Sequence, residues 1–272
     1  MSIWHAIVLG IVQGVGEFAP ISSSGHLIVV PWLLGWGEDQ GLAFDVALHF
    51  GTLLALLGYF ARDLWRLTRE CFSGMLSPGG FWPAQRRYLL PLVLGCLPAA
   101  LAGFFMEGFV ESVLRSPVIV ASLLASMGVV LYLCDRAGQK QRTLAETGPA
   151  DWLAVGLSQA LALFPGVSRS GVTISAGLLV GIRREAAARF SFLISIPIVA
   201  GASALEGRML LKQGIPPDEK MAFAVGILTA AVFGYLCIKF LLAYLRTRGV
   251  NVFVWYRLAV AAVVAATLIT RR

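Results

Sequence analysis

Two short runs of the sequence contain the residues whose types and spacing could do chemistry. In the first run, Gln13 and Glu17 are four residues apart, so they share one face of a helix. Ser23 and His26 follow after a proline, and their spacing of three residues would also place them on one face. Serines that precede a short helix are natural N-caps, and the free amide N–H groups at a helix start bind anions. This run therefore offers an acid, a histidine and hydroxyl groups beside an anion site.

The second run, residues 165–173, repeats the serine–glycine frame but carries Arg169 where the first run has Ser23. Arginine is the side chain best shaped to hold two phosphate oxygens with parallel N–H donors. The hydroxyl groups beside it are those of Ser168, Ser170 and Thr173. Taken together, the two runs suit phosphoryl transfer, in which enzymes mainly position groups and stabilise charge.

An internal duplication relates the two runs. A shift of 146 residues aligns 10–35 with 156–181 and gives nine identities in 26 positions, where roughly two would arise by chance from this composition. The identities include the pairs Ser22/Ser168, Ser24/Ser170 and Gly25/Gly171. We predict a single membrane domain over 1–272, with one repeat at about 1–134 and the other at about 147–270.

The elements that must position these runs are membrane helices. The chain is 58% hydrophobic and only 14% charged, whereas soluble domains are nearer half apolar and a quarter charged. Six apolar segments approach or exceed the ~20 residues that cross the ~30 Å hydrocarbon core of a bilayer. They are Leu42–Ala61, Tyr88–Met106, Pro117–Cys134, Phe190–Leu205, Met221–Leu245 and Val252–Thr270. The sequence therefore predicts an all-α integral membrane protein with six transmembrane helices.

Two further regions, Ile3–Gly35 and Trp152–Gly181, are apolar but broken in the middle by the two polar runs. Neither half of either region is long enough to span a bilayer, so we predict two re-entrant helical hairpins. Three predicted spans separate the copies, and an odd number inverts the second copy relative to the first. Irregular backbone at that depth must be buried in protein or line a wet cavity, so the two hairpin tips are expected to meet.

The basic residues predict the orientation. The side that receives 62–87, 135–151, 182–189 and 246–251 has 13 Lys and Arg, and the other side has 6. The positive-inside rule then places both termini outside the cytoplasm. The net charge of +7 is thus loop charge between apolar segments, which argues against a nucleic-acid partner.

Several other residues are expected to have no chemical role. The four cysteines show no CxxC spacing and are predicted to be buried filler. The first apolar stretch lacks a basic start and is interrupted by Glu17, so a cleaved signal peptide is not expected. His49 is expected to line the cavity or to pack. His5, Asp45 and Glu206 receive no assignment.

Both runs resemble the signature motifs of a known protein family. The run Gln13-x-x-x-Glu17-Phe-x-Pro-x-Ser-Ser-x-Gly-His26 resembles the first signature of the undecaprenyl-diphosphatase family of bacitracin-resistance type, and Pro165-Gly-x-Ser-Arg-Ser-x-x-Thr173 resembles the second. The likeness covers essentially the whole chain in length, helix count and repeat spacing. Gln13 stands where many relatives carry a second glutamate, which argues against a metal site built on two carboxylates.

The resemblance implies removal of the terminal phosphate from undecaprenyl diphosphate, which recycles the lipid carrier of bacterial envelope synthesis. It implies a site in the inner membrane that opens to the periplasm, and a divalent cation, Mg²⁺ or Ca²⁺. The expected partners are the polyprenyl diphosphate lipid and the membrane, with no nucleic acid, and a homodimer is compatible with the sequence.

The family pattern also implies roles for residues of this chain. The expected catalytic residues are Glu17, Ser23, His26 and Arg169, with Glu17 also a candidate metal ligand. The expected substrate-binding residues are Gln13, Ser22, Ser168, Ser170 and Thr173. Ser23 is the favoured nucleophile, with His26 as its base or as the acid for the leaving group. A water nucleophile would use the same residues.

Three other classes of protein share part of this pattern. The type-2 phosphatidic acid phosphatases need a second histidine after the arginine, and no histidine follows His49 in this chain. A membrane transporter or lipid flippase is the main alternative, because inverted repeats with broken helices are typical of transporters. A purely structural membrane subunit leaves Arg169 unexplained, since ionisable groups inside a membrane are costly and mark function.

Overall fold

The computed structural model describes residues 1–36, 42–75, 90–103, 105 and 116–271. These residues form helices, and an isolated bridge between Arg142 and Ile182 is the nearest approach to a strand among them. The expected all-α class is therefore confirmed for the described part of the chain. Four of the helices are long and apolar enough to cross a membrane. They are α6 (Pro117–Ala137), α9 (Arg184–Gln213), α10 (Lys220–Thr247) and α11 (Asn251–Thr270).

The two other predicted spans are shorter helices. Helix α3 (Leu42–Tyr59) matches the predicted span Leu42–Ala61, and a helix over Leu90–Gly103 lies within the predicted Tyr88–Met106, whose ends fall partly outside the described residues. Helix α4 (Ala61–Met75) begins directly after α3 in a segment that we expected to be a connection. Its apolar residues recur at the three- and four-residue spacing of a helix, so α4 has one apolar face although the segment is polar overall.

Both broken regions are pairs of short helices, as the duplication predicted. The first is α1 (Ile3–Phe18) and α2 (Ser23–Leu34). The second is α7 (Pro149–Ala160), a single 3₁₀ turn (Leu161–Leu163) and α8 (Arg169–Leu179). Each helix has 11 to 16 residues, so each is only about 17–24 Å long at 1.5 Å per residue.

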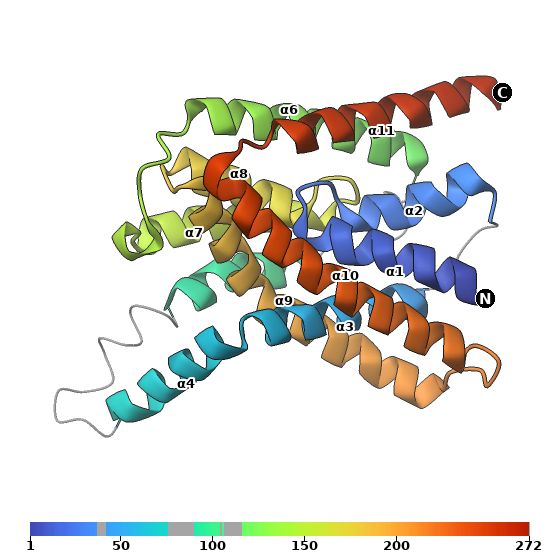
Figure 1. The fold of residues 1–272 in the computed structure, drawn as a ribbon, viewed down its shortest axis with the longest axis horizontal. Coiled ribbons are helices and arrows are strands. Elements are labelled where there is room, and N and C mark those ends of the chain that lie inside the picture. Colours follow the sequence, from blue (N-terminus) through green and yellow to red (C-terminus); the bar gives the residue numbers. More distant parts are fainter. Residues whose placement is uncertain (37–41, 76–89, 104, 106–115, 272) are drawn as a thin grey trace.

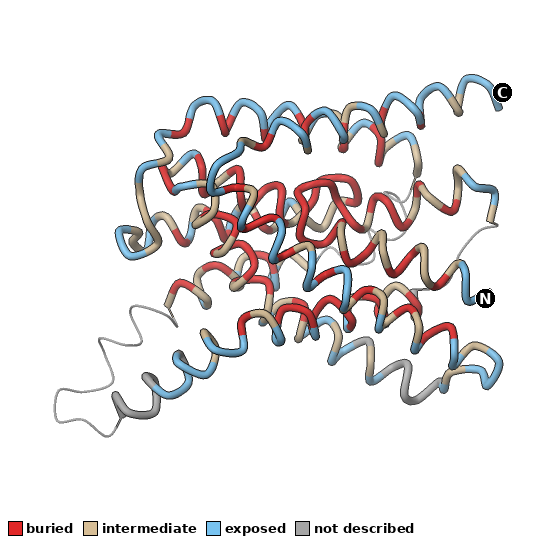
Figure 2. The backbone as a smooth tube through the Cα atoms, viewed as in Figure 1, coloured by how far each residue is buried: buried red, intermediate tan, exposed pale blue. Residues whose placement is uncertain are grey.

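The breaks lie at the centre of the molecule, surrounded by the longer helices. Helices α1 and α10 run side by side, as do α6 and α11 (Figure 1). Small residues allow the first contact, because a Cβ added at Gly14 would lie 2.7 Å from the Ala230 carbonyl oxygen. The buried backbone is concentrated where α1, α2 and α8 meet, while the outer helices expose their outward faces (Figure 2). These outer faces carry large apolar side chains, as lipid contact requires.

Cysteines behave as expected where the structure describes them. Cys96, Cys134 and Cys237 are free thiols, buried or partly buried among the helices. The side chain of Cys71 lies outside the described set. None of these three thiols forms a disulfide in the described structure.

Candidate active site

The tips of the two broken helices have the same unusual backbone. Ser22 and Ser168, which align in the duplication, are the N-caps of α2 and α8 and have φ angles of 75° and 76°. A positive φ in a residue other than glycine costs on the order of 1–3 kcal/mol and persists only where the surroundings enforce it. Each serine Oγ accepts a hydrogen bond from the amide of the glycine three residues on, Gly25 at 3.3 Å and Gly171 at 3.1 Å.

Reciprocal hydrogen bonds join the tips to each other. The Gly166 amide of the second tip donates to Ser22 Oγ of the first at 3.1 Å. Ser170 Oγ of the second tip donates to the Ala19 carbonyl of the first, also at 3.1 Å. The two tips therefore meet, as the sequence predicted.

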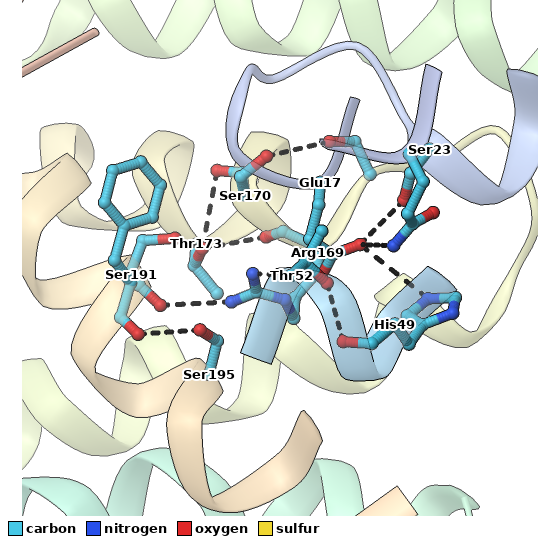
Figure 3. Close-up of polar contacts among 12 residues, drawn as sticks. Glu17, Ser23, His49, Thr52, Arg169, Ser170, Thr173, Ser191 and Ser195 are labelled. Atoms are coloured by element: carbon cyan, nitrogen blue, oxygen red, sulfur yellow. Dashed lines mark hydrogen bonds and ion pairs between the residues drawn. The ribbon is translucent and has the colours of Figure 1, made fainter. Parts of the chain in front are cut away.

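Glu17, at the end of α1, is the centre of the polar cluster (Figure 3). Its side chain is 7% exposed. Oε2 accepts hydrogen bonds from Ser23 Oγ at 2.8 Å and from Gln13 Nε2 at 3.1 Å. Oε1 accepts one from Arg169 Nη2 at 3.2 Å, which is also an ion pair. One carboxylate thus joins a hydroxyl of the first tip to the guanidinium of the second.

The guanidinium of Arg169 keeps an N–H donor available for a ligand. Its Nη1 donates to the Ser191 carbonyl at 3.1 Å, and its Nη2 is taken by Glu17. Its Nε is buried and has no hydrogen-bond partner among the described residues. A buried charged donor without a partner is costly, so this nitrogen is suited to an incoming anion.

A cavity of about 250 Å³ opens beside this cluster. Its polar walls are formed by Glu17, Ser22, Ser23, Ser24, His49, Gln159, Ser168, Arg169 and Ser203. Gln159 Oε1 and Ser203 Oγ are further buried polar atoms without a partner in the described structure. The cavity therefore presents unused donors and an unused acceptor beside the ion pair, as a site for a polar ligand does.

His49 on α3 lines the cavity, one of the two roles expected for it. Its Nδ1 donates to the Asp45 carbonyl at 2.8 Å, since a carbonyl can only accept. This fixes the proton on Nδ1 and turns Nε2 toward Glu17 Oε2, 3.8 Å away. His49 thus lies beside the carboxylate in the cavity wall.

His26 has different neighbours from those expected of a base for Ser23. Its Nδ1 donates to the Ser22 carbonyl at 2.7 Å, which leaves Nε2 to accept from the Tyr256 hydroxyl at 2.9 Å. His26 does not line the cavity, and Ser23 instead donates to Glu17. Its catalytic role stays a prediction, and the contacts favour a role in holding the backbone of the first tip.

The predicted site residues divide into two groups. Those in the cavity wall are Glu17, Ser22, Ser23, Ser168 and Arg169. Those behind the wall are Gln13, His26, Ser170 and Thr173. The Thr173 hydroxyl, for example, donates to the backbone carbonyl of Arg169 at 2.7 Å and contacts Ser191 Oγ at the same distance, so it links α8 to α9 and does not line the cavity.

Sequence reasoning missed two neighbouring residues of α11, Tyr256 and Arg257. Tyr256 contacts His26, and Arg257 is fully buried against both tips. Both lie in a segment that we predicted only as a span. The available signal was a lone arginine within a stretch of twenty otherwise uncharged residues.

A divalent cation held by the protein does not fit the described side chains. No group of three His, Cys, Asp or Glu able to hold a metal occurs among the described residues. Glu17 is neutralised by Arg169, and both of its oxygens already accept hydrogen bonds. Gln13 turns its NH₂ group, not its carbonyl oxygen, toward this carboxylate. A hard cation such as Mg²⁺ needs available carboxylate or phosphate oxygens, so Glu17 is a poor ligand in this arrangement.

The fold and the site together define the class of protein: an all-helical, multi-pass membrane protein with an acid–arginine–serine site enclosed between its helices. A family model described as "Bacitracin resistance protein BacA" matches residues 6–263. The chain is 48% identical to the undecaprenyl-diphosphatase of Moorella thermoacetica over 272 residues, which is 100% of each chain. It is 47% identical to that of Thermomicrobium roseum over 270 residues, which is 97% of each. The chain therefore belongs to the BacA family, and the resemblance inferred from its motifs is confirmed.

Proposed function

We propose that this protein is an undecaprenyl-diphosphatase that removes the terminal phosphate of undecaprenyl diphosphate at the cavity between the two tips. The observation that carries the proposal is the contact of Glu17 with both Ser23 and Arg169, buried beside that cavity in a membrane protein. The two relatives described above are named undecaprenyl-diphosphatases, and this chain matches them over nearly their full length. The products are undecaprenyl phosphate and inorganic phosphate, so the enzyme returns a lipid carrier to bacterial envelope synthesis.

The contacts support Ser23 as nucleophile and Glu17 as its base. In the first step Glu17 Oε2 takes the hydroxyl proton, Ser23 Oγ bonds to the terminal phosphorus, and the bridging P–O bond breaks to release undecaprenyl phosphate. In the second step water attacks the phosphoserine, the P–Oγ bond breaks, and the proton returns to Ser23 as phosphate leaves. Glu17 already accepts a hydrogen bond from this hydroxyl at 2.8 Å, the reach that a general base needs.

Arg169 and the serine-capped tips would hold the diphosphate. The Nε of Arg169 has no partner among the described residues, and a terminal phosphate would supply oxygens to accept its hydrogen bond. The amides at the starts of α2 and α8 add partial positive charge at the same place. Because Glu17 is a poor metal ligand here, any Mg²⁺ or Ca²⁺ would arrive on the diphosphate oxygens of the lipid.

Purified protein in detergent should release phosphate from undecaprenyl diphosphate. A double variant, Glu17→Gln with Arg169→Ala, is the matched blank, because it removes both charges of the buried pair together and leaves neither unpaired. Parallel assays with Mg²⁺, with Ca²⁺ and with EDTA test the cation. Phosphate release no greater than that of the double variant under every condition would reject the enzyme and favour a transporter.

We also propose the finer topology: six spans and two re-entrant hairpins, arranged as an inverted repeat with both termini in the periplasm. Three observations support it. The four helices of the broken regions are too short to span, and the aligned serine caps share one backbone conformation. Both chain ends lie at one end of the molecule in Figure 1, whereas the α6–α7 connection and the outer part of α4, which belong to the basic side, lie at the other.

The orientation predicts a labelling result. A cysteine in a short C-terminal tag should react with a membrane-impermeant maleimide in intact spheroplasts, because the basic segments hold the other side in the cytoplasm. The matched control is a cysteine at Lys140 in the α6–α7 connection, which should react only after the membrane is permeabilised. The opposite pattern would invert the topology.

A further inference from the structure

Arg257, near the start of α11, makes an unusual set of contacts. Its side chain is fully buried, with 0% exposure. All of its described acceptors are backbone carbonyls. They are Pro20 O at 3.0 Å, Gly166 O at 2.7 Å, Val167 O at 3.2 Å, Leu123 O at 3.4 Å and Leu124 O at 3.0 Å. One guanidinium therefore ties the first tip, the second tip and helix α6 together.

This arrangement needs an explanation other than stability. A buried cation is expensive to desolvate, and an arginine in a membrane span usually meets a carboxylate or a water-filled cavity. Arg257 has no ion pair within the described structure and does not line the cavity. The guanidinium is planar and its N–H groups point in fixed directions. It can therefore donate to all of these carbonyls only while the two tips and α6 keep their present distances from one another.

The tips have a reason to need such a tie. Each turns through a serine with a positive φ, and such a conformation persists only under restraint from outside. The restraint on the first tip includes His26, whose Nδ1 donates to the Ser22 carbonyl and whose Nε2 is held by Tyr256, next to Arg257 in the chain. Consecutive residues of α11 therefore hold the backbone on both sides of the strained Ser22.

We propose that Arg257 is a positioning residue that fixes the two tips in register, so that Ser23 on one tip faces the phosphate held by Arg169 on the other. The proposal rests on the proposed function. Arg257 reaches neither side chain directly and acts through Pro20, Gly166 and Val167, which lie within three residues of them. A shift of about 1 Å between reacting groups can cost about 10²-fold in rate, whereas it changes ground-state binding far less.

The kinetic test is Arg257→Lys, because lysine keeps the charge but presents its donors from a single point. We expect kcat per folded protein to fall about 100-fold while KM changes by less than about threefold. The matched control is Arg271→Lys at the C-cap of the same helix. Arg271 also donates to two backbone carbonyls, those of Trp32 and Leu33. It is exposed, however, and these carbonyls belong to the far end of α2 and not to a tip. This control should keep wild-type kcat.

Hydrogen exchange gives a readout that does not depend on activity. Arg257→Lys should speed exchange in peptides covering both tips, 19–26 and 165–172, and leave α10 at the wild-type rate. If the lysine variant does not fold, Arg257→Gln and Ser170→Ala replace it, because Ser170→Ala removes a bond between the tips without removing a charge. Both should show the same pattern at smaller amplitude.

Two results would overturn the proposal: an unchanged kcat in folded Arg257→Lys protein, or faster exchange spread evenly over all helices. The second result would mean that Arg257 supports the whole fold rather than the tips. If wild-type protein released no phosphate, the proposed function would be wrong. The exchange pattern would still decide whether Arg257 holds the two tips together.

Discussion

Ser23→Ala is expected to lower kcat by on the order of 10⁴-fold or more, because it removes the hydroxyl that we propose as nucleophile. Binding of the lipid diphosphate should persist, since Arg169 and the tip amides are unchanged. Steady-state phosphate release measures the first effect and equilibrium binding of the lipid the second. Rapid quench of wild-type protein with substrate labelled in the terminal phosphate should also trap a phosphoserine at position 23.

The matched control for this variant is Ser122→Ala. Ser122 is an exposed serine of α6 whose hydroxyl donates to the Val118 carbonyl within its own helix, so its loss should leave kcat unchanged. Measurable turnover in Ser23→Ala, together with no labelled serine, would assign the attack to a water held by Glu17. The site residues would stand in that case, and the serine nucleophile and the phosphoserine intermediate of our mechanism would be wrong.

The same quench experiment separates the two candidate bases. Glu17→Gln keeps the size of the side chain but cannot take a proton, so phosphoserine formation should fall about 10²–10⁴-fold. His26→Gln should cost less, because His26 contacts Ser22 and Tyr256 rather than the nucleophile. The reverse order of effects would restore His26 as the base.

The pairing of the two tips could be predicted from sequence because its determinants are local. Short apolar pieces interrupted by serine, glycine and proline cannot span, and the alignment of Ser22 with Ser168 places one cap in each copy. Once the two caps must meet, the acid of one run and the arginine of the other must lie close together. The contact of Glu17 with Arg169 follows from that argument, and the structure contains it.

The direction of the His26 ring could not be predicted in the same way. Spacing along a helix places Ser23 and His26 on neighbouring turns, but the ring follows its hydrogen-bond partners. One of these, Tyr256, is 230 residues away in sequence. The same holds for Arg257, whose carbonyl partners come from three segments that only the tertiary structure brings together.

The ends of helices near charged residues were also predicted poorly from the sequence. We began the fourth predicted span at Phe190, whereas α9 begins at Arg184, because Arg184 forms a fork with Asp135 at 2.6 and 2.9 Å that anchors the helix start. Hydropathy marks where a helix can lie in lipid, and it does not detect helical turns that extend beyond the apolar layer. The inverted repeat itself stays a prediction, supported by the matching caps.

Arg169→Lys separates the geometry of the phosphate clamp from its charge. Lysine can neutralise Glu17, but it cannot at once donate to Glu17, to the Ser191 carbonyl and to a phosphoryl oxygen in the directions that the guanidinium offers. We therefore expect kcat/KM to fall about 10²–10³-fold, similar to the loss of a preorganised donor at a developing charge. The measurement is phosphate release over a range of lipid diphosphate concentrations.

The control is Arg184→Lys, which breaks the fork between Arg184 and Asp135 outside the cavity and should change kcat/KM by less than about twofold. Arg169→Ala is less informative, because it would leave the buried Glu17 carboxylate without its ion pair and cost about 3–5 kcal/mol of stability. Full activity of Arg169→Lys would mean that the arginine only balances the charge of Glu17. The oxygens of the diphosphate would then have to be held by the amides of the two capped tips and by Ser203, whose hydroxyl is the remaining unpartnered donor in the cavity wall among the described side chains.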